Sequence, residues 1–163
     1  MKNLEASSSK LAAPSKIFLF AFPLLSAIGF SDATYLTVKH FLGTTVPCSI
    51  LHGCEQVLTS KYSSIWGVPV ALFGSLYYLT ILILSAIYLE TRNLLFLKIA
   101  AALTFLGFAA SLGFVYLQIF VIKSICLYCM GSALTSTLLL ITGVLFLLKT
   151  KSARPNLPEE QTK

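Results

Sequence analysis

The stretch Cys126-Leu127-Tyr128-Cys129 opens an apolar run that extends from Ile125 to Leu148. A run of this length predicts a membrane-spanning helix. Ser124 precedes it and is the predicted N-cap, which places both cysteines in the first turns of the helix. Residues three apart share a helix face, so the two sulfurs can approach each other. The helix dipole and Lys123 favour the thiolate, the form that exchanges disulfides.

Composition places the chain in a membrane. Of its 163 residues, 56% are hydrophobic and 11% are charged, whereas about 25% of the residues of a soluble domain are charged. The net charge of +6 comes from basic residues scattered around the apolar blocks. This scatter indicates membrane topology rather than a nucleic-acid partner. Since there is no glycine-rich phosphate loop and no carboxylate pair, the chemistry to consider is that of cysteine.

Four apolar runs predict an all-α, integral membrane four-helix bundle with one extracytoplasmic loop between its first two helices. Each run of about 22 residues would measure roughly 33 Å as a helix, enough to cross about 30 Å of hydrocarbon. The runs are Ile17–Val38, Val68–Leu89, Leu97–Val121 and Ile125–Leu148. The predicted organisation is a disordered tail at 1–16, the membrane domain at 17–149 and a second disordered tail at 150–163.

The loop from His40 to Trp66 contains the other two cysteines, Cys48 and Cys54. They are six residues apart, and Gly53 allows the chain to turn tightly before the second. This spacing permits a small disulfide loop but does not require one. Pro69 suits the first turn of a helix and predicts that the second membrane helix begins there.

Asp32 lies inside the first apolar run, about a turn from its outer end. A carboxylate at membrane depth is a candidate functional group, because its burial is costly. The alternative is a structural carboxylate near the lipid headgroups that pairs with Lys39 or with the loop. The sequence leaves both interpretations open.

The distribution of basic residues predicts the topology. Four spans place both termini on one side, where nine lysines and arginines fall, against three on the other side. This asymmetry predicts cytoplasmic termini. All four cysteines then lie outside, where disulfides persist. The nine are Lys2, Lys10, Lys16, Arg92, Lys98, Lys149, Lys151, Arg154 and Lys163, and the three are Lys39, Lys61 and Lys123.

Four cysteines can also serve two other purposes. A pair of structural disulfides would favour the same side of the membrane, but a CxxC that opens a helix favours a reactive pair. A zinc site usually shows paired short CxxC spacings, and here one pair is six residues apart. No metal is therefore predicted.

With these features in place, the sequence resembles the vitamin K epoxide reductase family, in particular its short microbial members without a fused thioredoxin-like domain. The resemblance extends from about Gly29 to Ala133. It rests on the segments Gly29–Thr37, Pro47-Cys48, Cys54–Ser60 and Ile65–Pro69 and on the Cys126–Cys129 motif. The loop pair, a serine six residues after its second cysteine and a CxxC at the head of the last helix form a specific combination.

The resemblance implies a bundle that holds a quinone (ubiquinone, menaquinone or phylloquinone) near the outer leaflet. It implies that Cys48 and Cys54 form the shuttle pair, that Cys126 and Cys129 form the quinone-side pair, and that Ser60 supports the site by hydrogen bonding. The expected electron donor is a thioredoxin-fold, DsbA-like thiol oxidant. The expected location is a bacterial inner membrane, with the cysteines facing the periplasm.

One residue near the CxxC motif bears on the choice of substrate. Vertebrate members carry a tyrosine four residues after the CxxC, where this chain has Ala133, so a thiol oxidase is expected rather than a reductase of vitamin K epoxide. The alternatives are such an epoxide or quinone reductase, and a non-catalytic membrane protein with two structural disulfides. Candidate lining residues of an apolar quinone pocket are Phe73, Tyr77 and Phe114.

Overall fold

The computed structural model describes residues 16–44 and 53–152. Its long helices are α2 (Lys16–Leu42), α4 (Val70–Thr91), α5 (Leu94–Tyr116) and α6 (Leu127–Ser152), and α5 continues into a π-helix, η1 (Leu117–Ile122). The shorter elements are α3 (Gly53–Leu58) and a hairpin of β1 (Ser64–Ile65) and β2 (Val68–Pro69). Cys48 and most of the two expected tails lie outside the described residues.

Four of these helical stretches are long and apolar enough to cross a membrane: Phe18–Leu42, Val70–Thr91, Leu94–Ile122 and Leu127–Thr150. Many of their large apolar side chains point outward, among them Phe20, Leu106 and Leu148. Such a surface is stable against lipid and costly in water. The predicted all-α, four-helix membrane bundle is therefore confirmed, and within the described residues the structure adds the short helix α3 and the β1–β2 hairpin.

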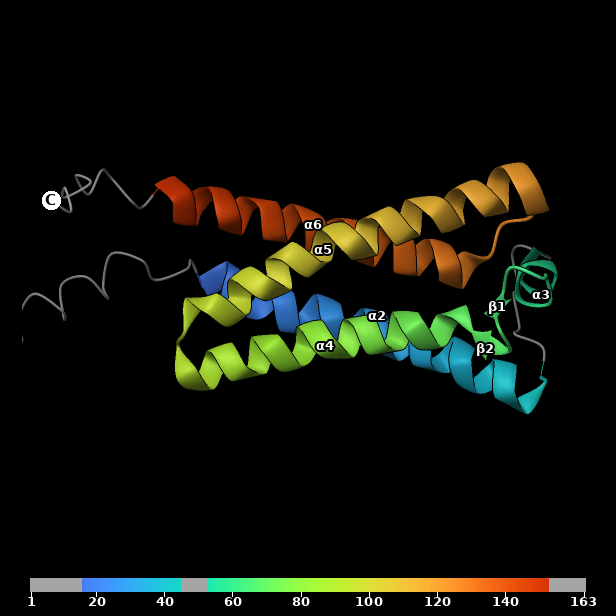
Figure 1. The fold of residues 1–163 in the computed structure, drawn as a ribbon, viewed down its shortest axis with the longest axis horizontal. Helices are drawn as coiled ribbons and strands as arrows, with labels where there is room; N and C mark the ends of the chain where they lie inside the picture. Colours follow the sequence, from blue (N-terminus) through green and yellow to red (C-terminus); the bar gives the residue numbers. More distant parts are fainter. Residues whose placement is uncertain (1–15, 45–52, 153–163) are drawn as a thin grey trace, which may run out of the picture.

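The long helices form a closed ring in which α2 packs against α4 and α6, and α5 packs against the same two neighbours. Figure 1 shows that the start of α2, the α4–α5 connection and the end of α6 lie at one end of the bundle. At the other end lie α3, the hairpin and the junction between η1 and α6. The three described cysteines therefore belong to the same end.

The core is apolar, with Phe22, Ile81 and Leu139 fully buried. Phe18 and Phe22 pack edge-on against Phe146, with ring centroids 5.9 and 6.4 Å away. Aromatic pairs in this arrangement gain about 0.5–1.5 kcal/mol beyond the burial of their area. This cluster holds α2 against α6.

Hydroxyl groups connect the helices near the middle of the bundle. Tyr78 on α4 donates to the Ser132 carbonyl of α6 at 2.8 Å. The hydroxyls of Ser111 on α5 and Ser136 on α6 are 2.7 Å apart. In a membrane interior an unpaired polar group is costly, so these bonds favour one register between neighbouring helices.

Candidate active site

The first functional element is the junction between η1 and α6. Helix α6 begins at Leu127, and the Cys126 carbonyl accepts its first helical bond from the Met130 N–H at 3.0 Å. The prediction of Ser124 as the N-cap is therefore wrong, because Cys126 occupies that position. The Ser124 hydroxyl instead donates to Gln56 Oε1 on α3. The motif thus begins at the helix boundary rather than inside the helix.

The Cys126 thiol is fully buried, yet it is acidic. A hydrogen bond from the Cys129 thiol is the largest cause that lowers the pKa of Cys126, to about 7. The backbone N–H groups of Cys129 and Tyr128 act in the same direction, and burial acts against them. These N–H groups are the ones that an N-cap side chain normally satisfies. The expected stabilisation of a thiolate is thus present, with Cys129 rather than Lys123 as its main cause.

A titration tests this acidity. In the reduced protein we expect the ultraviolet thiolate absorbance of Cys126 to appear as the pH rises through about 7, whereas an unperturbed cysteine ionises near 8.5. Removing the largest cause in Cys129→Ala should move the midpoint upward. Subtracting the trace of Cys126→Ser isolates the signal. A midpoint at 8.5 or above in the parent would contradict the assignment.

Gln118 holds the junction in place and was missed in the sequence. Its side chain is 2% exposed and lies within η1. Its Oε1 accepts the Cys126 N–H at 2.9 Å, and its carbonyl accepts the backbone N–H groups of Lys123 and Ser124. π-Helical turns are frequent at functional sites. The available signal was an amide inside an apolar run, eight residues before Cys126.

The short helix α3 brings a third cysteine to the junction. Cys54 (1% exposed) and Val57 form one buried cluster with Cys126, against which Cys129 also packs. Cys54 is disulfide-bonded, whereas Cys126 and Cys129 are free thiols. Three of the four predicted cysteines therefore meet, and the fourth, Cys48, lies outside the described residues.

Close backbone contact explains how α3 reaches this position. A Cβ atom at Gly53 would lie 2.6 Å from the Ile125 carbonyl oxygen, much closer than van der Waals contact. Only glycine allows α3 to pack directly on the chain that leads into the CxxC motif.

Gly53→Ala should therefore separate α3 from the motif. We expect a loss of about 1–3 kcal/mol of stability, typical of overpacking, and faster labelling of Cys126 by a maleimide. Thermal unfolding in detergent and mass spectrometry measure the two effects. Gly131→Ala in α6 is the matched control, because its Cβ would meet nothing within 4 Å. Equal labelling rates in the two variants would contradict the role of Gly53.

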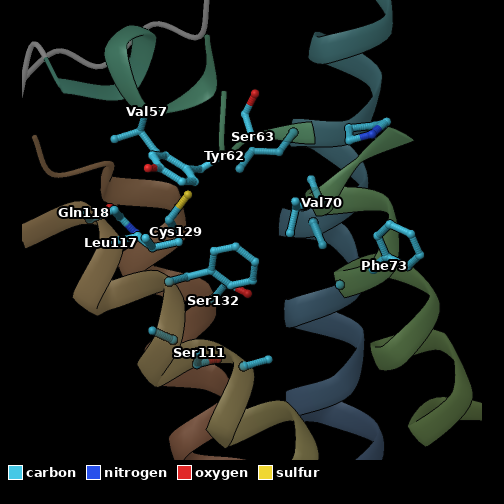
Figure 2. Close-up of a pocket in the computed structure, with 18 of the residues that line it drawn as sticks. Val57, Tyr62, Ser63, Val70, Phe73, Ser111, Leu117, Gln118, Cys129 and Ser132 are labelled. Carbon is cyan, nitrogen blue, oxygen red and sulfur yellow. The ribbon is translucent and has the colours of Figure 1, made fainter. Parts of the chain in front are cut away.

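Below the junction lies a cavity of about 340 Å³, which is lined by residues of all four long helices, α2, α4, α5 and α6. Figure 2 shows Cys129 and Gln118 on one side of it and Val70 and Phe73 on the other, with Val57 above. Most of its lining is apolar, and the three aromatic residues considered from the sequence all contribute: Phe73, Tyr77 and Phe114. Ala133 also lines the cavity. Cys129 is therefore the sulfur that faces a ligand-sized space.

Asp32 lines the same cavity, deeper than expected. Helix α2 continues to Leu42, ten residues beyond Asp32, which is about 15 Å along the axis. The helix extends through Lys39 and His40 because long basic side chains reach the interface from within a membrane helix. The placement of Asp32 one turn from the outer end is therefore wrong.

Two buried polar atoms have no hydrogen-bond partner within the described part of the chain: Asp32 Oδ2 and the Tyr77 hydroxyl oxygen. Both residues line the cavity. Lys39, one suggested partner of Asp32, places its Nζ 5.7 Å from the ring centroid of Tyr35. Orphaned polar groups in a membrane protein are costly. They indicate a cavity built for a ligand with polar atoms of its own.

Ser60 lies just beyond the last residue of α3 and makes hydrogen bonds there. Its hydroxyl donates to the Val57 carbonyl at 2.7 Å, and its carbonyl accepts the Ser63 N–H at 3.0 Å. Ser60 lines both the cavity and an outer polar groove. It therefore closes the end of α3 above Cys129.

The geometry joins a buried disulfide cysteine, an acidic thiol and a cavity-facing thiol. Comparison with family models matches residues 20–144 to the Vitamin K epoxide reductase family. This match extends from α2 through most of α6 and includes all four cysteines. Comparison with curated proteins finds no match. The chain therefore belongs to the vitamin K epoxide reductase family, a family of membrane oxidoreductases that act on thiols, disulfides and quinones.

Proposed function

We propose that this protein is a quinone-dependent thiol oxidase. It would oxidise a thioredoxin-fold, DsbA-like partner through its two cysteine pairs and pass the electrons to a membrane quinone, in support of disulfide formation. One observation carries the proposal: the described cysteines form a series from α3 to the cavity. Cys54 and Cys126 share a buried cluster, and Cys129 lines the cavity.

Electrons enter by thiol–disulfide exchange. A thiolate of the reduced partner attacks Cys48 of the Cys48–Cys54 disulfide and releases Cys54. Cys54 then attacks Cys126 of the Cys126–Cys129 disulfide and releases Cys129. Each exchange breaks one disulfide and forms another, so electrons move inward without loss.

Two further exchanges complete the transfer. The partner's second thiolate attacks its own mixed disulfide and releases Cys48, which attacks Cys54 and releases Cys126. A thiol with a low pKa leaves faster, and the pKa of Cys126 is lowered to about 7. The product has the loop pair oxidised and the CxxC pair reduced. This state agrees with a disulfide-bonded Cys54 and free thiols at Cys126 and Cys129.

The cavity fits a quinone. Its volume of about 340 Å³ falls within the range of small-molecule sites, which are mainly apolar with a few polar groups. Asp32 and Tyr77 place there two oxygens that have no partner among the described residues, and the Tyr77 hydroxyl and a protonated Asp32 would each donate to one carbonyl oxygen of a quinone ring. When bound, a quinone accepts two electrons and two protons. The named candidates, ubiquinone, menaquinone and phylloquinone, share such a ring and an apolar tail.

The lining also offers a path for that tail. Phe73 on α4 and Leu106 on α5 line the cavity while they are 51% and 66% exposed. They therefore form an outward-facing rim between these two helices. An apolar tail could pass this rim into the lipid without crossing a polar surface.

The proposed orientation has both termini in the cytoplasm and the cysteines in the periplasm of a bacterial inner membrane. The bundle supports it, because the basic residues sort between its two ends. Lys39, Lys61 and Lys123 accompany the cysteine end, and Lys16, Arg92, Lys98 and Lys149 belong to the opposite end. An excess of basic residues is typical of the cytoplasmic side.

The proposal is tested with the purified protein in detergent, dithiothreitol as donor and a short-tailed quinone as acceptor. We expect quinol formation accompanied by a change in the redox state of the CxxC thiols, followed by thiol trapping. Conversion of vitamin K epoxide at a comparable rate would assign the protein to the epoxide reductases instead. Cysteines that stay oxidised throughout would support two structural disulfides and contradict the proposal.

A further inference from the structure

One face of α2 connects the cavity to the outside. Asp32, Leu36 and His40 follow at intervals of four residues, so they lie on the same face of the helix, and all three line the cavity. Leu36 and His40 also line a second, outer groove with polar walls. The remaining polar residues of that groove include Lys39, Glu55, Thr59, Ser60 and Lys61.

The surroundings of Asp32 favour a neutral carboxylic acid. Its electrostatic neighbours are two phenols and two thiols: Tyr78, Tyr128, Cys126 and Cys129. The cavity-lining residues of α3, α5 and η1 include no ionisable group. Oδ2 accepts no hydrogen bond from any described residue. An ionised carboxylate without a donor or a cation is strongly disfavoured in an apolar site.

The Cys126–Cys129 pair supplies one proton fewer than quinone reduction needs. Forming a disulfide from Cys126 and Cys129 releases two electrons and the protons that the two sulfurs carry. Because the pKa of Cys126 is lowered to about 7, this sulfur starts largely as a thiolate above that pH. The pair then supplies two electrons but only one proton, from Cys129. Reducing a quinone to a quinol takes two electrons and two protons.

We propose that Asp32 is a cavity-lining acid that gives the second proton to the quinone, and that His40 resupplies Asp32 from the outer groove. This inference rests on the function proposed above. In each cycle one S–S bond forms, one proton leaves Cys129 and one leaves Asp32, and the resulting carboxylate is reprotonated from outside.

The position of His40 suits the second step. It lines both the cavity and the groove. Histidine is the side chain that ordinarily exchanges protons near neutral pH. Asp32 and His40 are eight residues apart, about 12 Å along the helix, so the proposed transfer between them requires bridging water molecules. In this proposal Asp32 donates directly to the quinone, and His40 acts through Asp32.

The first test needs no quinone. Asp32 is the chain's only aspartate, and we expect the infrared spectrum of the parent at neutral pH to show the C=O band of a protonated carboxyl group. Asp32→Asn should lose this band. Glu90→Gln, which removes an exposed carboxylate of α4 outside the cavity, should keep it. A parent without the band at neutral pH would overturn the inference.

The thiolate titration of Cys126 gives a second readout of the same state. An ionised Asp32 would raise the pKa of Cys126, so its removal would move the midpoint downward. A neutral Asp32 exerts no such effect. We therefore expect the same midpoint in the parent and in Asp32→Asn. A lower midpoint in the variant would contradict the inference.

Kinetic measurements distinguish the role of Asp32 from that of His40. In a single turnover of pre-reduced protein with a short-tailed quinone, Asp32→Asn should slow quinol formation on the order of 10²-fold, the lower end for general acids. Asp32→Glu should restore part of the rate. His40→Phe should keep the first turnover, because Asp32 starts protonated, and should slow only steady-state turnover.

If His40→Phe slows the first turnover and the steady-state turnover equally, the proposal that His40 reprotonates Asp32 would be overturned. A parental first-turnover rate in Asp32→Asn would overturn the part of Asp32. A parent that shows the carboxyl band but reduces no quinone would contradict the proposed function. A parent that reduces quinone with an ionised Asp32 would contradict this inference alone.

Discussion

Cys129→Ala is expected to reduce quinone-dependent turnover to background and to trap a disulfide between Cys54 and Cys126. Cys129 is the sulfur that lines the cavity, so its removal takes away the pair that delivers electrons there. Cys54 and Cys126 already pack in one buried cluster. In the variant the Cys126 thiolate attacks Cys54 of the Cys48–Cys54 disulfide and releases Cys48, and the new Cys54–Cys126 bond accumulates because it lacks Cys129 as its inner resolving thiol.

Mass spectrometry of non-reduced peptides identifies the trapped bond, and quinone absorbance follows turnover. Met130→Leu is the matched control, because this α6 side chain does not line the cavity. Full turnover driven by a protein partner in Cys129→Ala would exclude the proposed electron path.

Replacing one cysteine of the Cys48–Cys54 pair should have a different effect from replacing Cys129. Cys54→Ala leaves Cys48 as a free thiol, which attacks the disulfide of the oxidised partner, forms a mixed disulfide and releases the partner's second thiol. We expect a covalent adduct with the partner that disappears on reduction, visible on a non-reducing gel. The mixed disulfide persists when the partner's second cysteine is replaced by alanine, because neither that cysteine nor Cys54 is then present to resolve it.

Cys48→Ala should separate the two kinds of electron donor. Turnover with a protein partner should be lost, because the thiol that meets it is gone. Turnover with dithiothreitol should persist, because a small thiol can reach Cys54 or Cys126 when α3 opens. Both sulfurs are almost fully buried, so this rate should rise further when Gly53→Ala is added. Purely structural disulfides predict equal destabilisation in every cysteine variant and none of these differences.

The sequence by itself determined the membrane architecture. The length of each apolar run sets the number of crossings, because a backbone in lipid must satisfy its own hydrogen bonds within each helix. This requirement is local in the sequence, and four spans were predicted and found. With four crossings known, the cysteines of the loop and of the CxxC motif had to lie at the same end. The residues that carried the family resemblance fall within the matched range, residues 20–144.

Only the tertiary structure decided how the site works in detail. The N-cap at Cys126 depends on Gln118 and on the contact between Ser124 and Gln56, which come from other elements. The depth of Asp32 depends on how far α2 continues past its apolar run. The oxygens of Asp32 and Tyr77 that find no hydrogen-bond partner among the described residues are recognised only once the helices are packed together. Hydrogen bonding and burial at these positions are set by residues distant in the chain, so the periodicity and composition of a single segment do not contain them.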